Sequence, residues 1–339
     1  MFTKSKNIKL ICILLISIFI FTTLGLFLVR NNPQKTNLFS GFDSLTYQQK
    51  LESFSKTAIE DPQESWLFLK NKFTKSNQTI DDVHEFAHIV GNSAFKKYGV
   101  DGIKICDATF SYGCFHGITE SMILTIGKSV IPEIEKVCTE TFKTNPDFLS
   151  GCIHGSGHGL FGANNYSLEL SLEDCKAFQK DNGKYCYDGV FMEYSEHPEI
   201  YSGSEEKFIQ ICSDNGSDYQ ENCSRYIFAV FGNKHSWDIK KIALDCDNIK
   251  SENVAKECFI GIGYYAVFES KANVEKIIQT CKYLADNWVG YCIIGAVRQV
   301  FSQKYQNFEE IGQNLCQSIK SNKSAFQNCT KETQSLTNL

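Results

Sequence analysis

Fourteen regularly spaced cysteines between Cys106 and Cys329 limit the fold of this chain more than any other feature. The second members of successive pairs are 38, 34, 37, 35, 34 and 37 residues apart. A period near 36 residues is typical of two-helix repeats that stack into a solenoid. The seven pairs are Cys106/Cys114, Cys138/Cys152, Cys175/Cys186, Cys212/Cys223, Cys246/Cys258, Cys281/Cys292 and Cys316/Cys329.

The cysteines of each pair are predicted to form a disulfide. An even number of cysteines favours disulfides in an oxidising compartment, whereas thiolate metal sites normally contain close CxxC pairs, which this sequence lacks. In each unit an amphipathic helix ends around the first cysteine, a polar loop follows, and the second cysteine opens another helix. Closing such a loop contributes ~2 to 3 kcal/mol. The predicted fold is all-α, an α-solenoid-like array of about eight helical hairpins, of which seven are stapled.

A glycine follows the second cysteine by three residues in five of the seven units. Glycine inside a helix costs about 1 kcal/mol relative to alanine, so its recurrence requires a structural reason. Close approach of a neighbouring helix is the simplest reason. The five glycines are Gly117, Gly155, Gly189, Gly261 and Gly295.

The cysteine pairing and the Cys-x-x-Gly pattern resemble the disulfide-stapled helical-hairpin repeat proteins related to the Sel-like and tetratricopeptide solenoids. The resemblance covers roughly residues 100 to 335 and concerns architecture. It implies helical hairpins tied by their cysteines, and it implies binding of partner proteins. The loops between the cysteines are mostly longer here, and that family does not carry paired histidines.

The N-terminus contains an apolar segment. Lys4, Lys6 and Lys9 precede an uncharged run over residues 10–29, which is long enough to cross a bilayer as a helix. The lysines place residues 1–9 in the cytoplasm. The prediction is an uncleaved transmembrane signal anchor, with a cleaved signal peptide as the alternative. The bulk of the chain is then extracytoplasmic, behind a tether over residues 30–45.

The remaining chain is predicted to contain histidine-rich repeats over residues 46–165 and disulfide-stapled repeats over residues 166–335. The net charge of -5 provides no basic excess for a nucleic-acid partner. The predicted partners are the membrane and a protein or cell-envelope ligand.

Five of the seven histidines occupy equivalent positions in three consecutive units. Counted from the second cysteine, His116 and Glu120 lie two and six residues on, and so do His154 and His158. His84 and His88 have the same register in an unstapled first unit that begins at Asp82. Residues four apart share a helix face, so each unit presents one stacked pair of side chains. His197 and His235 lie in loop-like sequence and are interpreted as structural.

Equivalent helices of a solenoid lie side by side, so these side chains are predicted to converge on one metal site. Imidazole and carboxylate ligands suit a divalent metal, zinc before iron or manganese, and the number of ligands allows one ion or two. Helix packing without a metal and axial ligation of haem are the alternatives. The predicted ligands are His84, His88, His116, Glu120, His154 and His158.

The segment from His84 to His88 also matches HExxH, and Gly91 extends it to HExxHxxG, which is similar to the zincin metallopeptidases. The resemblance implies that both histidines bind zinc and that Glu85 is the general base. Ala94 stands where the metzincin pattern has a third histidine, and the repeat register already explains the histidine spacing.

Two functions follow from the sequence. The first is a membrane-anchored metal-binding protein that acts as a metal-dependent hydrolase, with Glu85, Glu120 or Glu193 as candidate acid/base groups. The second is a non-catalytic helical-repeat scaffold that binds a protein or a cell-envelope component. A metal ion with an open coordination position favours the first.

Overall fold

The computed structural model describes residues 39–73, 80–201, 205–213, 219–303, 305 and 307–337, and these residues form helices and no strands. The predicted all-α class is therefore confirmed for this part of the chain. The chain divides into two compact units, residues 1–57 and 58–339.

The described part of the first unit contains η1 (Phe42–Ser44) and most of α2 (Tyr47–Glu60). Phe42 is buried, and the ring centroids of Phe39 and Phe42 lie 5.6 and 6.4 Å from that of Phe54. The end of the predicted tether over residues 30–45 is thus folded, because the phenylalanines bury apolar area against α2. The remainder of that tether, residues 30–38, lies outside the described residues.

The predicted cytoplasmic segment over residues 1–9 and the predicted transmembrane helix over residues 10–29 also lie outside the described residues. Among the helices that the structure describes, none combines the length and the apolar character needed to cross a membrane.

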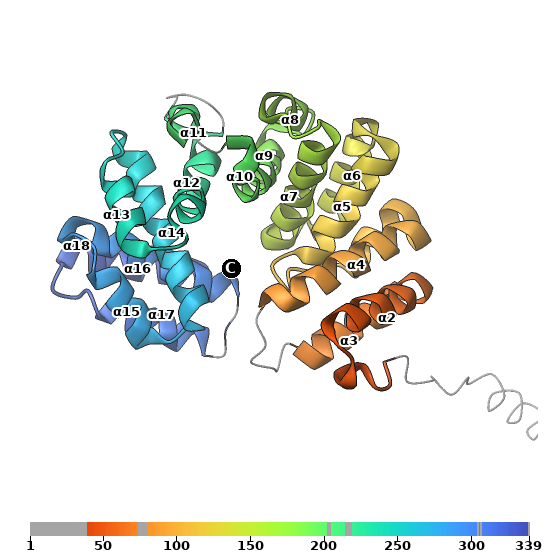
Figure 1. The fold of residues 1–339 in the computed structure, drawn as a ribbon, viewed down its shortest axis with the longest axis horizontal. Helices are drawn as coiled ribbons and strands as arrows, with labels where there is room; N and C mark the ends of the chain where they lie inside the picture. Colours follow the sequence, from red (N-terminus) through yellow and green to blue (C-terminus); the bar gives the residue numbers. More distant parts are fainter. Residues whose placement is uncertain are drawn as a thin grey trace, which may run out of the picture. The chain divides into compact units, whose positions relative to one another are not determined.

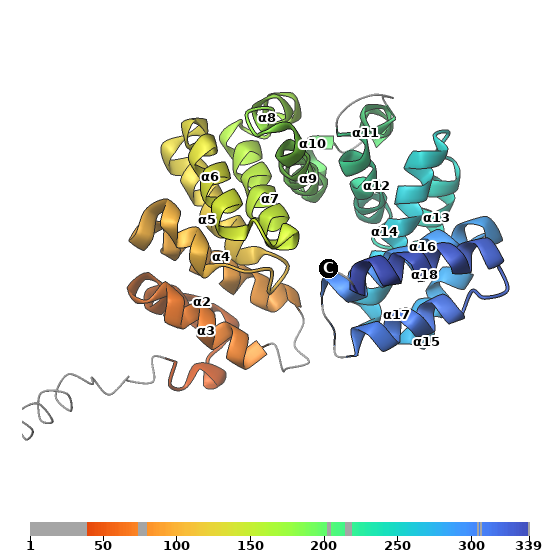
Figure 2. The same ribbon diagram turned by 180° about the vertical axis from the view of Figure 1, so that it is seen from behind.

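The second unit is built from alternating long and short helices (Figure 1). Each long helix packs against the next long helix along the chain, as the view from behind also shows (Figure 2). The long helices are α4 (Ile80–Tyr98), α5 (Gly113–Ile126), α7 (Pro146–Ala163), α9 (Lys180–Glu196), α12 (Gln220–His235), α14 (Glu252–Ser270), α16 (Asp286–Ser302) and α18 (Lys323–Thr337).

The short elements pack against the long helices that follow or precede them. They are α3 (Pro62–Phe73), η2 (Gly99–Ile105), η3 (Lys128–Val130), α6 (Ile131–Phe142), α8 (Leu168–Cys175), α10 (Pro198–Tyr201), α11 (Glu205–Cys212), α13 (Ile239–Asp247), α15 (Val274–Lys282) and α17 (Phe308–Gln317). The predicted repeat of two helices around each cysteine pair is confirmed.

All seven predicted disulfides are present, with Cα–Cα distances from 5.2 to 6.0 Å. Each one ties a short element to the next long helix, and every one of these cysteines is buried. The bridges fix the turn of each hairpin, where a short helix with a thin core is most easily lost. They join Cys106 to Cys114, Cys138 to Cys152, Cys175 to Cys186, Cys212 to Cys223, Cys246 to Cys258, Cys281 to Cys292 and Cys316 to Cys329.

The place of the second cysteine within its long helix differs from the prediction. This cysteine was expected to open the helix, and the expectation is correct for Cys114, one residue after the start of α5. It is wrong for the other six units, in which the long helix begins three to six residues before the cysteine. The cysteines that lie inside the helix and do not open it are Cys152, Cys186, Cys223, Cys258, Cys292 and Cys329.

The polar residues before these cysteines explain the difference, because they form the first helical turns and not a loop. In α7, for example, the side chain of Asn145 accepts a hydrogen bond from the Phe148 backbone N–H at 3.2 Å, and Pro146 follows the cap. Asparagine at the cap and proline directly after it are typical of a helix start. Cys152 therefore lies beyond the first turn of α7, on its buried side.

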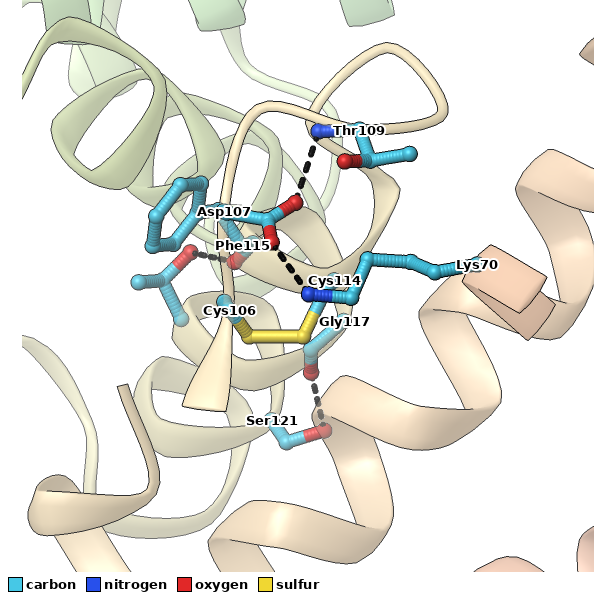
Figure 3. Close-up of a disulfide and its surroundings, with 9 residues drawn as sticks. Lys70, Cys106, Asp107, Thr109, Cys114, Phe115, Gly117 and Ser121 are labelled. Atoms are coloured by element: carbon cyan, nitrogen blue, oxygen red, sulfur yellow. Dashed lines mark hydrogen bonds and ion pairs between the residues drawn. A yellow bond between two sulfur atoms is a disulfide. The ribbon is translucent and has the colours of Figure 1, made fainter. Parts of the chain in front are cut away.

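The first disulfide illustrates the staple (Figure 3). Cys106 follows η2 and Cys114 lies in the first turn of α5. Between them, Asp107 accepts hydrogen bonds from Lys70 Nζ of α3 at 2.8 Å and from the Thr109 backbone N–H at 2.9 Å. These bonds anchor the loop at its start.

The recurrent glycines lie at contacts between long helices, as predicted. A Cβ atom on Gly117 would lie 2.1 Å from the carbonyl oxygen of His88, and one on Gly189 would lie 2.0 Å from that of His154. Gly295 meets the carbonyl oxygen of Ile260 in the same way, at 2.0 Å. Only glycine allows the backbones to approach so closely, and this brings the neighbouring side chains together.

Candidate metal centre

Five histidines from three adjacent long helices form one cluster in the second unit. His84 and His88 come from α4, His116 from α5, and His154 and His158 from α7. Two groups of three have ligand atoms within 4.8 Å of one another, and both groups contain His116. The predicted convergence of these five side chains is therefore found. The close backbone contact at Gly117 explains it, because it draws α4 onto α5 next to His116.

The two histidines on α4 and the two on α7 form equivalent pairs. The Nε2 atoms of His84 and His88 lie 3.1 Å apart, and so do those of His154 and His158. Two nitrogens bound to one tetrahedral zinc ion at about 2.0 Å are about 3.3 Å apart. The helical spacing of four residues therefore sets each pair close to the separation that a shared ion requires.

In the α7 pair, both Nδ1 atoms contact carboxylates of α9. His154 Nδ1 lies 3.0 Å from Asp188 Oδ2, and His158 Nδ1 lies 2.5 Å from Glu193 Oε2. Carboxylates accept hydrogen bonds, so both Nδ1 atoms carry protons and the lone pairs of neutral rings are left on the two Nε2 atoms. In neutral rings these lone pairs face each other at 3.1 Å, and a metal ion or a proton shared between the two nitrogens removes their repulsion. An outer carboxylate that orients a histidine in this way is typical of metal ligands.

The α4 pair is oriented by a strained turn. His84 Nδ1 donates to the carbonyl oxygen of Phe110 at 2.8 Å. Phe110, Ser111 and Tyr112 have φ angles of 57°, 52° and 63°, a left-handed conformation that costs non-glycine residues about 1 to 2 kcal/mol each. The turn lies between Cys106 and Cys114, so the first disulfide helps to hold the carbonyl group against His84.

His116 lies at the centre of the cluster and has no hydrogen-bond partner within the described residues. Its side chain is buried, and neither Nδ1 nor Nε2 finds a donor or an acceptor. A buried polar group without a partner costs about 1 to 3 kcal/mol, so both nitrogens are expected to bind something else. A metal ion is the ligand that imidazole nitrogens bind most readily in such surroundings.

The electrostatic surroundings of His88, His116 and His154 favour the neutral ring, the form that binds metal. Burial and the neighbouring imidazoles hold the pKa of His116 well below its ordinary value. Burial and His84 lower the pKa of His88 to about 3, and burial lowers the pKa of His154 despite the hydrogen bond to Asp188. Burial would raise the pKa of Glu193, but the hydrogen bond from His158 outweighs it and lowers this pKa to about 2.

The metal-free protein is expected to become less stable as the pH falls from 7 to 5. The unfolded chain binds protons on these histidines below pH ~6.5, whereas the folded chain does not, so acid favours unfolding. Protonation of the carboxylates Asp188 and Glu193 changes the free energy of unfolding only below pH ~4, because the pKa values of both groups are lowered in the folded chain. Urea unfolding with a chelator present should show a loss of ~2 kcal/mol from His116 alone. A H116F variant should show a smaller loss, and an equal loss in both proteins would contradict this explanation.

Two predicted site residues, Glu120 and Glu85, do not lie among the clustered histidine nitrogens. Glu120 Oε2 lies 3.9 Å from His88 Nδ1, beyond hydrogen-bond distance, on the side of the ring away from the Nε2 atom that faces His84. Glu85 is exposed on α4. Gly91, the last residue of HExxHxxG, packs against α5, where a Cβ atom would lie 2.1 Å from the carbonyl oxygen of Cys114.

The candidate site also includes groups that were not predicted as site residues. Asp188 accepts from Arg225 at 2.7 Å, from Tyr226 at 2.9 Å and from Asn222 at 3.2 Å, in addition to contacting His154. Burial would raise the pKa of Asp188, but Arg225 outweighs it and holds this pKa well below its usual range. The sequence signal is the repeat register, because Asp188 follows its second cysteine by two residues, as His116 and His154 do.

Glu193 links the cluster to a further histidine. Its Oε1 atom lies 3.0 Å from Nε2 of His197, whose Nδ1 contacts Glu199 at 2.6 Å. His235 contacts Asp245 at 2.8 Å instead. Both histidines outside the register thus form hydrogen bonds with carboxylates, in agreement with their structural interpretation. Only Glu193 joins one of them to the cluster.

A cavity of about 960 Å³ lies beside the cluster, and His116 and His154 are part of its lining. Its other walls come from several repeats, including Tyr112 before α5, Arg225 on α12 and Arg298 on α16. The Ser111 and Gln303 side chains form a hydrogen bond of 3.1 Å across this cavity, although they are 192 residues apart in sequence. The end of α16 thus borders the same cavity as His116 and His154.

Comparisons with protein-family models, with curated proteins and with solved structures find no match to this chain.

Proposed function

We propose that this chain is a metal-binding helical-repeat protein whose histidine cluster binds divalent metal ions, with zinc as the first choice and iron or manganese as alternatives. The observation that carries the proposal is His116, which is buried with two nitrogens that have no hydrogen-bond partner in the described residues and which belongs to both three-histidine groups. The facing Nε2 atoms of the two pairs support it. Nitrogen ligands alone suit zinc and other borderline divalent ions better than calcium or magnesium.

The proposal includes a location outside the cytosol, with residues 10–29 as a membrane anchor. Seven buried disulfides support an oxidising compartment, because such bonds rarely persist in the cytosol. The apolar run and the lysines before it support the anchor.

The cavity favours a metal-dependent hydrolase as the activity. Three histidines leave one position of a tetrahedral ion open for water, and a metal ion lowers the pKa of bound water to about 7. The proposal draws support from the cavity, which is large enough for a small-molecule substrate and has His116 and His154 among its lining residues. Glu85 and Glu120 remain the candidate acid/base groups, and the second function is a scaffold that binds a protein or cell-envelope partner without chemistry.

Elemental analysis of the full-length protein, purified in detergent with its disulfides formed, tests the metal. The native protein is expected to contain stoichiometric divalent metal. The double variant H84A/H154A, which removes one ligand from each pair, should bind it at least 100-fold more weakly. The variant H235A is the matched control, because His235 contacts Asp245 outside the cluster and should retain full occupancy.

Absence of metal from the native protein after reconstitution with zinc, iron and manganese would reject the metal-binding function. It would leave the scaffold as the remaining function. Stoichiometric metal in the native protein and in H235A, but not in H84A/H154A, would support screening for hydrolysis. Bound metal without turnover in that screen would indicate the scaffold.

A further inference from the structure

We infer that the cluster holds two metal ions and that His116 bridges them as an imidazolate. This inference rests on the proposed metal binding and goes beyond it, since it sets the number of ions and gives His116 a role that differs from that of the other four histidines. One ion would lie between His116 and the α4 pair, and the other between His116 and the α7 pair.

The position of the His116 ring is the first support. Its centroid lies 5.3 Å from the centroids of both His84 and His88, and 5.1 and 4.4 Å from those of His154 and His158. Two imidazoles bound to one tetrahedral ion have centroids about 5 Å apart. The His116 ring therefore lies close enough to both pairs to share a metal ion with either one.

The hydrogen bonds of the ring nitrogens are the second support. Three of the five histidines, His84, His154 and His158, have Nδ1 hydrogen-bonded to an oxygen atom, and Nδ1 of His88 lies 3.9 Å from a Glu120 carboxylate oxygen. His116 is the exception, because neither of its nitrogens has a partner in the described residues. A histidine that binds a single ion normally donates its other N–H group to an acceptor. Two unpartnered nitrogens are what a ring that binds an ion on each side requires.

The surroundings of the two pairs are the third support. Asp188 and Glu193 of α9 place carboxylate charge beside the α7 pair, and Glu120 places a carboxylate near His88. Binding of the second ion displaces the remaining N–H proton of His116 to solvent, which leaves a bridging anion between two cations. The anionic bridge and these carboxylates offset the repulsion between the ions, which would lie about 6 Å apart.

Copper(II) is the probe that tests the bridge, because two copper ions joined by an imidazolate couple magnetically. The full-length native protein is expected to bind two copper ions per chain, with an electron paramagnetic resonance intensity well below that of two isolated ions. The variants H84A/H88A and H154A/H158A should each bind one ion with full single-ion intensity. The variant H116A keeps both pairs, so any copper that it retains should be uncoupled.

Each other result overturns the bridge in a distinct way. Two ions with the full intensity of isolated copper would place them in independent sites. One ion per chain in the native protein would leave a mononuclear centre, in which case metal binding stands and the bridge fails. No copper at all would reject both. Circular dichroism melting of each variant confirms that a lost ion does not reflect a lost fold.

Discussion

Replacing Gly117 by alanine is expected to destabilise the protein by about 3 kcal/mol and to weaken metal binding about 10- to 100-fold. The added Cβ atom would lie 2.1 Å from the carbonyl oxygen of His88 and 2.8 Å from its Cα atom. Backbone atoms cannot move aside as a flexible side chain does, so α4 and α5 must separate. That separation moves His84 and His88 away from His116 and opens the first three-histidine group. Urea unfolding and zinc titration measure the two effects.

Gly162→Ala is the matched control for this substitution. Gly162 lies on α7, and its added Cβ atom would meet nothing nearer than Leu124 Cδ2 at 3.8 Å. Alanine is favoured over glycine in a helix by up to about 1 kcal/mol, so this variant should be as stable as the native protein or more so. Equal losses of stability in both variants, or unchanged zinc affinity in G117A, would show that the close helix contact does not position the histidines.

Complete reduction of the disulfides is expected to unfold the second unit at 25 °C. Each bridge joins cysteines 8 to 14 residues apart and contributes about 2 to 4 kcal/mol. Seven such contributions exceed the total stability of about 5 to 15 kcal/mol that is usual for a folded domain. The helical circular dichroism signal should therefore fall once all cysteines are reduced and blocked. A cooperative thermal transition after complete reduction would show that the hairpins are stable without their staples.

The effect of removing a single disulfide on metal binding is expected to depend on its distance from the histidines. The variant C316S/C329S removes the last staple, which joins α17 to α18 away from the histidines, so metal binding should be retained. The variant C138S/C152S frees the turn before His154 and should weaken metal binding as well as stability. Equal zinc affinity in both variants would indicate that the staples support the fold alone.

Local features of the sequence were sufficient for the architecture. The cysteine period and the loops between paired cysteines predicted the hairpins and all seven bridges, because a disulfide across one turn depends only on neighbouring residues. The glycine three residues after the second cysteine, found in five of the seven units, predicted close contacts between long helices, and such contacts occur at Gly117, Gly189 and Gly295. The short helix η1 at the end of the predicted tether was not foreseen, because burial of Phe42 depends on a contact with Phe54 that polar composition does not reveal.

The starts of most long helices were predicted too late along the chain. The helices were expected to begin at their second cysteines, but those cysteines lie three to six residues inside them. Polar residues at a helix start resemble a loop in composition, because the first turn needs side chains that bind its unpaired N–H groups. The misplaced starts are those of the helices that contain Cys152, Cys186, Cys223, Cys258, Cys292 and Cys329.

The repeat register was also sufficient to select the five histidines. Each occupies the same helix face in consecutive units, and a solenoid places equivalent faces side by side. The register did not separate ligands from supporting groups. It grouped Glu120 with the predicted ligands, and this carboxylate lies 3.9 Å from Nδ1 of His88; it gave no distinct role to Asp188.

The sequence by itself thus determined the helical hairpins, their staples and the residues that meet, since periodicity and short loops encode all three. The tertiary structure alone decided which nitrogen of each histidine faces the centre, that Phe110 and Glu193 orient two of the rings, and that His116 has no partner among the described residues. It also decided that α16 faces the same cavity as the histidines. These properties depend on small rotations between successive repeats, which accumulate along the array and which no single segment of the sequence specifies.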